Sequence, residues 1–282
     1  SVLYQLVPFD HAPELSTGWE RRIEGLRKLT ERAAKYGIGV YLYYNEPRAM
    51  PLSFFRDRPE WMGHVEGNHA CLCTSHPEVQ QYLQDSTARL FREVPELAGI
   101  FTITMSENLT NCYSRTASPS CPRCSKRPPE EVAAEVIRCI AAGARSVKPD
   151  ARIICWLWGW NWPLEQVKNG IRQLPAGVAV MCTSEEGMPT NVGGVENRVI
   201  DYAMSVAGPG EKARACWQTA LACGMTAAAK VQLNITWECS AVPFLPVYEL
   251  IEQHLTRLQD SGVTALQLSW TPGGYPSLNL EL

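Results

Sequence analysis

The feature that most constrains the fold is an alternation of short apolar runs with amphipathic segments along almost the whole chain. The runs have the length and composition of buried strands, and the segments between them carry apolar residues three or four positions apart, as helices do. We expect helices at 18–36, 76–94, 128–147, 163–174, 211–224 and 246–262. We expect strands at 2–9, 37–44, 97–107, 151–160, 177–187, 230–238 and 264–270, with a hairpin-like segment at 199–210.

Strands that alternate with helices pair in parallel through right-handed crossovers, so the sequence predicts an α/β fold. A (β/α)8 TIM barrel and an open doubly wound sheet share this pattern. The barrel is favoured because no glycine-rich phosphate loop follows the early strands and because polar and aromatic residues gather where strands end. Since only seven strands are counted, we expect one barrel domain over residues 1–282, with at least one N-terminal strand preceding Ser1 in a longer protein.

Composition narrows the classes of partner. The net charge of −3 provides no basic surface for nucleic acid. The apolar runs break within roughly a dozen residues, whereas a membrane span needs about 20. Most of the 11 cysteines lie in apolar segments and are expected to be buried, reduced thiols, which indicates a cytoplasmic protein. The sequence does not indicate an oligomeric state.

Two glutamates occupy equivalent places in the pattern. Glu107 ends the strand FTITM, and Glu238 ends a strand three strands later. A carboxylic acid with apolar neighbours can keep its proton and act as a general acid, while a second carboxylate acts as nucleophile or stabilises positive charge. The alternative for each is a structural acid that binds a loop backbone or forms a salt bridge.

Other strand ends carry side chains suited to sugars, because sugar rings stack their C–H faces on aromatic residues and their hydroxyls need hydrogen bonds. These candidates are Tyr44, Asn45, Glu46, Arg48, Asn108, Trp158, Trp160, Glu185, Glu186, Trp237 and Trp270. The tryptophans of CWLWGWNW alternate, which on a strand places them on one face. We expect Trp156 in the core and Trp160 in the pocket, with core packing as the alternative for all of them.

A cysteine motif follows Glu107. Cys112, Cys121 and Cys124 form C-x8-C-x2-C, and a C-x2-C pair in a reduced compartment indicates structural zinc. The fourth ligand would come from Cys71, Cys73, His69 or His76. The alternative is a loop held by packing alone. Catalysis requires no cofactor in this interpretation.

The segments LTERAAKYGIGVYLYYNEPRAMP and YLQDSTARLFREVPELAGIFTITMSENLTNC resemble the third- and fourth-strand region of family 20 β-N-acetylhexosaminidases. In that family the fourth strand ends in an Asp-Glu pair whose Glu is the general acid/base, so the resemblance implies this role for Glu107. Ser106 replaces the Asp that positions the substrate acetamido group, which speaks against substrate-assisted catalysis. The placement of Glu107 and Glu238 is instead similar to that in retaining barrel glycosidases with two catalytic carboxylates.

The sequence therefore predicts a glycoside hydrolase with a carbohydrate substrate. A catalytically silent, carbohydrate-binding barrel is the second hypothesis, favoured by Ser106 and by the missing first strand. A metal-dependent hydrolase that uses the cysteine loop ranks last, because three thiolates make a closed structural site rather than an open catalytic one.

Overall fold

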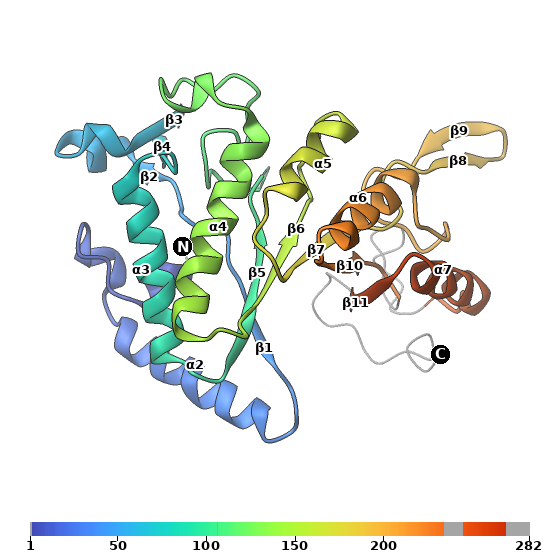
Figure 1. The fold of residues 1–282 in the computed structure, drawn as a ribbon, viewed down its shortest axis with the longest axis horizontal. Coiled ribbons are helices and arrows are strands. Elements are labelled where there is room, and N and C mark those ends of the chain that lie inside the picture. The colour runs from blue at the N-terminus through green and yellow to red at the C-terminus, as the bar shows by residue number, and fades with distance from the viewer. Residues whose placement is uncertain (1, 106, 234–244, 269–282) are drawn as a thin grey trace. The chain divides into compact units, whose positions relative to one another are not determined.

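The computed structural model describes residues 2–105, 107–233 and 245–268. The chain divides into two compact units, one formed by Ser1–Trp162 with Gln173–Val178 and the other by Pro163–Arg172 with Ala179–Leu282. Both units contain helices and strands. Among the described residues, six strands pair in parallel, three in each unit (Figure 1). The predicted α/β alternation is confirmed. A complete (β/α)8 barrel needs eight strands, and closure into such a barrel is not shown.

The first unit is built on three parallel strands in the order β1, β5, β6. Their bounds are β1 Val40–Tyr43, β5 Leu97–Ile103 and β6 Arg152–Trp156. Tyr43 pairs with Phe101 and Ile103 with Trp156, so the carboxyl ends of these strands share one edge. Because β5 is buried along almost its whole length, the residues that follow it are placed by the core.

Three predicted helices complete this part of the unit, namely α2 (Trp19–Ala34), α3 (Pro77–Glu93) and α4 (Pro129–Val147). The helices α3 and α4 lie side by side (Figure 1). Their backbones approach so closely at Gly143 that an added Cβ would lie 2.3 Å from the carbonyl oxygen of Gln84. Glycine at this position is therefore a requirement of helix packing.

The strand predicted at residues 2–9 is wrong, because Val2–Leu6 form helix α1. Leu3, Leu6 and Val7 are buried, and they are three and four positions apart, as on one face of a helix. A short apolar run of this kind is compatible with either a helix or a strand. The free backbone N–H of Leu3 donates to the Glu46 carboxylate at 3.1 Å, which satisfies one N-terminal donor of the helix.

A small antiparallel sheet between β1 and α3 was not predicted. It has the order β2, β4, β3, with bounds β2 Met50–Pro51, β4 His69–Leu72 and β3 Met62–Glu66. Short 3-10 helices accompany it at Pro13–Ser16, Leu52–Arg56 and Pro59–Trp61, and another follows at Cys124–Lys126. Its strands are only two to five residues long, which is too short to show a clear period in the sequence.

The second unit holds three further parallel strands in the order β7, β10, β11. Their bounds are β7 Val178–Thr183, β10 Thr226–Lys230 and β11 Val263–Gln267, and the predicted helices are present as α5 Leu164–Arg172, α6 Glu211–Ala222 and α7 Tyr248–Asp260. The strand expected at 230–238 is displaced: β10 is the run TAAAK and ends at Lys230, residues 231–233 are not in a strand, and residues 234–238 lie outside the described residues. The hairpin expected at 199–210 lies at β8 Pro189–Val192 and β9 Val195–Arg198 instead.

Within the described residues, no helix combines the length and the apolar character needed to cross a membrane.

Candidate active site

Glu107 lies four residues beyond the end of β5, where two side chains from the end of β1 hold its carboxylate. The Tyr43 hydroxyl donates to Glu107 Oε2. The Asn45 Nδ2 group donates to the same oxygen at 3.1 Å and to the Tyr43 hydroxyl at 2.7 Å. Both donors bond Oε2, which leaves Oε1 outside this pair of bonds.

Asn45 is oriented by the backbone of β5. Its Oδ1 accepts the N–H of Ile103 at 2.9 Å, so the amide nitrogen must turn toward Tyr43 and Glu107. The residue is only 3% exposed, and the contact links the ends of two neighbouring strands. Asn45 is thus both a structural crosslink and the residue that positions the Glu107 carboxylate.

Tyr43 is the important side chain that sequence reasoning missed. The sequence favoured its neighbour Tyr44, but Tyr44 is fully buried and its hydroxyl lies 3.0 Å from Thr87 Oγ1 on α3. Adjacent strand residues face opposite sides, and the pair Tyr43-Tyr44 offers the same side chain to both. Burial, followed by the hydrogen bond to Glu107, raises the pKa of Tyr43 above its usual range, so its hydroxyl stays protonated and can donate.

A row of aromatic rings runs from the candidate carboxylate across the strands. The ring centroids of Tyr43 and Phe101 are 5.3 Å apart, those of Phe101 and Trp156 are 5.7 Å apart, and those of Trp156 and Trp158 are 6.0 Å apart. Trp156 is buried, whereas Trp158 is half-buried. The row supports Tyr43 by stacking and ends in a ring that retains an accessible face.

Trp160 does not lie in a pocket as expected. It is fully buried, and its Nε1 donates to Thr104 Oγ1 at 3.1 Å. The expectation assumed that the tryptophans alternate along a strand, but β6 ends at Trp156 and the chain turns at Gly159, whose φ is +83°. The ring of Trp162 packs at a tilt against that of Trp160, with centroids 5.1 Å apart, and Trp162 is the half-buried one of the pair.

A hollow of about 470 Å3 separates the loop after β5 from the turn after β6. Its lining includes Met105, Tyr113, Arg115, Asn161 and Trp162. Met105, two residues before Glu107 in the sequence, lines this hollow, whereas Glu107 is not among its lining residues. The hollow offers an aromatic ring, an amide and a guanidinium group, which are groups found in ligand pockets. Arg115 and Asn161 were not predicted, because their loops show no period in the sequence. Trp162 belongs to the alternating run CWLWGWNW, in which the sequence favoured Trp158 and Trp160 as the pocket residues.

The remaining predicted residues of this strand edge have different surroundings. Glu46 is 1% exposed, and its carboxylate accepts the Leu3 amide, so it supports α1 rather than facing solvent. Arg48 is half-buried and near enough to Tyr43 for its charge to act on that hydroxyl. Asn108 is half-buried next to Glu107. Of these three, Arg48 and Asn108 keep surface that a ligand could reach.

Glu185 and Glu186 belong to the second unit, where they follow β7. Glu185 is fully buried, and its Oε1 lies 3.2 Å from Nδ1 of His254, whose Nε2 lies 2.7 Å from Ser184 Oγ. The order serine, histidine, acid matches that of serine hydrolases, but all three side chains are at most 4% exposed, so no substrate reaches the hydroxyl. Glu186 pairs with Lys212 at 2.7 Å beside a hollow of about 720 Å3.

A buried lysine at the end of β10 was also missed. Lys230 is fully buried, with Nζ 3.0 Å from the Val231 carbonyl oxygen and 4.4 Å from the ring centroid of Tyr202. Burial lowers the pKa of Lys230 to about 8, against the opposing charges of Glu185 and Asp201. The signal in the sequence is a lysine inside the apolar run AAAKVQL. The sequence predicts a strand that begins at this lysine, whereas β10 ends there.

Three predicted residues, Glu238, Trp237 and Trp270, lie outside the described residues. The roles of these residues stay predictions.

The three cysteines predicted as metal ligands, Cys112, Cys121 and Cys124, lie together in the first unit. The Sγ atom of Cys73, one of the four named alternatives for the remaining ligand, joins them.

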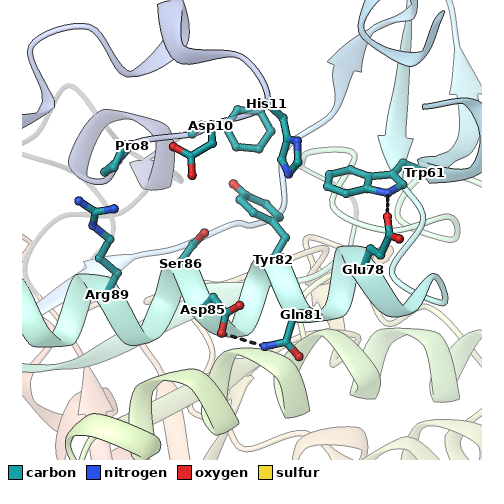
Figure 2. A pocket seen from close by; sticks show the side chains of 11 residues that line it. Pro8, Asp10, His11, Trp61, Glu78, Gln81, Tyr82, Asp85, Ser86 and Arg89 are labelled. Atoms are coloured by element: carbon teal, nitrogen blue, oxygen red, sulfur yellow. Dashed lines mark hydrogen bonds between the residues drawn. The ribbon is translucent and has the colours of Figure 1, made fainter. Parts of the chain in front are cut away.

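A second hollow of the first unit, about 390 Å3 in volume, lies against α3 (Figure 2). Asp10, His11, Trp61, Tyr82 and Arg89 are among the residues that line it, and Trp61 Nε1 donates to Glu78 at 2.8 Å. The figure shows Asp10 and His11, from the segment after α1, opposite Tyr82 and Arg89 on α3, with Trp61 to one side. None of its lining residues follows a parallel strand, so we do not assign it to the active site.

Comparisons with known proteins show the type of fold. No family model matches the chain, and no curated protein matches it. The chain is similar to a GH138 enzyme that targets the pectin rhamnogalacturonan II, with 13% identity over 94% of this chain and 27% of that one and a TM-score of 0.54. It is also similar to a family 89 glycoside hydrolase from Clostridium perfringens in complex with PUGNAc, with 13% identity over 94% of this chain and 26% of that one and a TM-score of 0.50. The catalytic domain of β-amylase from Paenibacillus polymyxa is similar as well, with 12% identity over 91% of this chain and 83% of that one and a TM-score of 0.50.

The chain thus spans about a quarter of the length of the first two structures. At 12–13% identity these similarities concern the fold alone. The resemblance to family 20 stays a prediction from the sequence. What the comparisons show is an α/β fold similar to that of glycoside hydrolases.

Proposed function

We propose that this chain is a glycoside hydrolase whose general acid/base is Glu107. The observation that carries the proposal is the carboxylate beyond β5, held at one oxygen by Tyr43 and Asn45, in a fold similar to those of glycoside hydrolases. Active sites of (β/α) barrels form from residues at the carboxyl ends of strands, which is where all three side chains lie.

Glycosidic bond cleavage needs a proton for the leaving oxygen and a group that meets the positive charge at the anomeric carbon. Glu107 would give its proton to the leaving oxygen and then, as a carboxylate, take one from the attacking water. Glu238 is proposed as the second carboxylate, acting as nucleophile in a retaining mechanism. Trp237 and Trp270 are proposed to hold the ring.

The described surroundings suggest how a sugar would bind beside Glu107. The half-buried rings of Trp158 and Trp162 offer faces for stacking, and Arg115 and Asn161 offer hydrogen-bond donors to hydroxyl groups. Glu107 follows the apolar run FTITM, which predicts a dry setting, yet its side chain is exposed in this structure. In the proposed mechanism, a bound sugar excludes water from the carboxylate.

The test compares Glu107→Gln with Glu96→Gln. Glu96 is an exposed glutamate just before β5, at the opposite end of the strand from Glu107. A screen of chromogenic glycosides first identifies a substrate. On glycosides with poor leaving groups, Glu107→Gln should lower kcat/KM by at least ~10²-fold, in line with the loss of general acid catalysis. Activated aryl glycosides need little protonation and should lose much less, while Glu96→Gln should act as the unaltered protein.

Small and equal losses on both substrate classes would show that Glu107 is not the acid. Absence of turnover on every glycoside, together with sugar binding measured by calorimetry, would favour the catalytically silent barrel instead.

A further inference from the structure

Four cysteines of the first unit converge on one point. Cys73 follows β4, whereas Cys112, Cys121 and Cys124 belong to the loop after β5. Their Sγ atoms all lie within 4.8 Å of one another, and no member is more than 1% exposed. We propose that these four thiols bind one structural zinc ion, which fixes the loop that carries Glu107.

The distances suit a metal better than disulfides. The Sγ atom of Cys73 lies 3.5 Å from that of Cys121 and 3.7 Å from that of Cys124. A disulfide requires about 2.05 Å between sulfurs. Tetrahedral zinc with bonds of about 2.3 Å to sulfur separates neighbouring sulfurs by about 3.8 Å. The cluster therefore has the dimensions of a four-thiolate zinc site.

The backbone of the C-x2-C pair is arranged to present both sulfurs together. The N–H of Ser125 donates to the Cys121 carbonyl at 3.0 Å, and the N–H of Arg127 donates to the Cys124 carbonyl at 2.9 Å. These bonds close two consecutive turns, the second a short 3-10 helix. Two ligands in one compact turn reduce the entropy lost when a metal is bound, which is why this spacing recurs in zinc sites.

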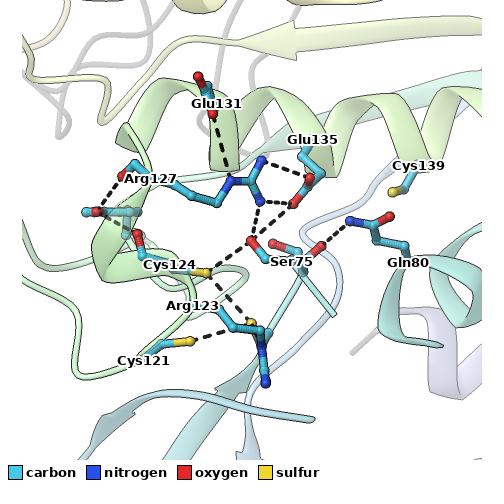
Figure 3. Close-up of polar contacts among 12 residues, drawn as sticks. Ser75, Gln80, Cys121, Arg123, Cys124, Arg127, Glu131, Glu135 and Cys139 are labelled. Atoms are coloured by element: carbon cyan, nitrogen blue, oxygen red, sulfur yellow. Dashed lines mark hydrogen bonds and ion pairs between the residues drawn. The ribbon is translucent and has the colours of Figure 1, made fainter. Parts of the chain in front are cut away.

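Donors around the cluster match the charge that a four-thiolate site would carry. Four thiolates and one Zn2+ sum to a net charge of −2. The Nε group of Arg123 donates to Cys73 Sγ at 3.4 Å, and Ser75 Oγ lies 3.2 Å from Cys124 Sγ (Figure 3). Arg127 bonds Ser75 and is itself held by Glu135 at 3.0 Å. Outer partners of this kind orient the ligands and stabilise their ionised form.

A fifth thiol nearby supplies a control. Cys71 Sγ accepts the N–H of His64 at 3.1 Å and lies 3.7 Å from Cys112 Sγ, yet it is not among the four that share one centre. Gly63 leaves space for both sulfurs, since a Cβ there would lie 2.6 Å from Cys71 Sγ and 2.8 Å from Cys112 Sγ. Cys71 is thus as buried as the four proposed ligands and lies next to one of them, but its sulfur is not part of the four-sulfur cluster.

The metal would complete the attachment of the loop that carries Glu107. Near β5, the carbonyl oxygen of Thr104 accepts bonds from Thr110 Oγ1 at 2.8 Å, Asn111 Nδ2 at 2.7 Å and Ser114 Oγ at 3.2 Å. Farther along, the thiolates of Cys112 and its partners would tie the same loop to the end of β4 through Cys73. The loop would then be held on both sides of its course.

The first experiment uses the unaltered full chain, purified without chelator or added metal. Mass spectrometry of metals should find about one zinc per chain. Exchange with Co2+ should give the thiolate-to-cobalt charge-transfer band and the visible bands of tetrahedral cobalt. Removal of zinc by a chelator should lower the Tm by roughly 10 °C, because a structural metal contributes directly to folding. Absence of a stoichiometric metal, or iron in place of zinc, would overturn the proposal without depending on any variant or on the proposed glycosidase activity.

The second experiment compares variants. Cys73→Ser and Cys121→Ser should lose most of the zinc, whereas Cys71→Ser and Cys139→Ser, a buried thiol outside the four-sulfur cluster, should keep it. If a ligand variant does not fold, alkylation of the unaltered protein decides the question: the four thiols should be protected until the chelator is added. Equal zinc loss in Cys71→Ser and Cys73→Ser, or alkylation that the chelator does not change, would refute the assignment of ligands.

Discussion

Replacing Asn45 with aspartate exchanges the amide nitrogen that donates to both Tyr43 and Glu107 for a second carboxylate oxygen. The bond from Ile103 N–H to Oδ1 remains, so the change is almost isosteric. The new oxygen would lie about 3.1 Å from Glu107 Oε2. Two unit charges at that distance repel by roughly 5 kcal/mol at an effective dielectric constant of 20.

Two effects reduce this figure. Glu107 is exposed, so water and salt screen the repulsion. The Tyr43 hydroxyl can also donate to the new carboxylate. We therefore expect Asn45→Asp to lower the free energy of unfolding by about 2 kcal/mol at neutral pH, which corresponds to a fall in Tm of roughly 4–8 °C.

The loss should depend on pH in a definite direction. Repulsion raises the pKa of the new carboxyl above that of an unfolded aspartate, so the folded protein binds more protons and stability falls as pH rises through this window. Thermal unfolding followed by tryptophan fluorescence should show the loss at about pH 7.5 and little of it near pH 4. Asn68→Asp, the same change at an exposed turn residue, should show neither effect.

An Asn45→Asp variant that is as stable as the unaltered protein at neutral pH would refute the contact between the two side chains. An equal loss at both pH values would place the damage in the backbone link to Ile103 rather than in the repulsion.

Two further predictions concern packing and burial. Gly143→Ala should destabilise the protein by more than 1 kcal/mol, because the added Cβ would meet the Gln84 carbonyl oxygen at 2.3 Å. Gly25→Ala in α2, where the added Cβ meets nothing within 4 Å, should instead stabilise the protein by about 0.5–1 kcal/mol. Urea unfolding measures the free energy of unfolding of both variants, and changes of the same sign in the two would contradict the contact between α3 and α4. The pKa of Lys230 in the folded protein, about 8, lies below that of an unfolded lysine, so between about pH 8 and 10 the unfolded chain binds more protons than the folded protein. The free energy of unfolding should therefore rise with pH across this range, by up to about 3 kcal/mol. Lys230→Met should lack this rise, and parallel urea-unfolding curves across that range would show that the ammonium group is not desolvated.

The sequence alone predicted the elements that repeat a simple period. In the part of the chain that the structure describes, the helices α2 to α7 and the parallel strands β1, β5, β6, β7 and β11 follow from apolar spacing, because one face of each must be buried. That Glu107 follows a buried strand was also predicted, although β5 ends at Ile103 and Glu107 lies four residues beyond it rather than at its last position.

Short segments with mixed patterns could not be predicted in this way. The apolar run at Val2–Leu6 suits a strand or a helix equally, and the bond from Leu3 N–H to Glu46 favours the helix only once β1 has brought that glutamate near. The turn at Gly159 ends the alternation of tryptophans and moves Trp160 into the core. The spacing of apolar residues along the sequence predicts neither the helix at Val2–Leu6 nor the burial of Trp160.

The details of the candidate site were decided by tertiary structure. Tyr43 and Tyr44 are chemically identical neighbours, and only the register of β1 against β5 turns Tyr43 toward Glu107 and Tyr44 toward α3. Likewise, spacing marked Cys121 and Cys124 as a pair, but the sequence left four alternatives for the last partner of the thiol cluster. The small antiparallel sheet selected Cys73, because β4 delivers that sulfur to the loop after β5. Contacts between distant segments depend on how the strands pair in space, which a single sequence does not state.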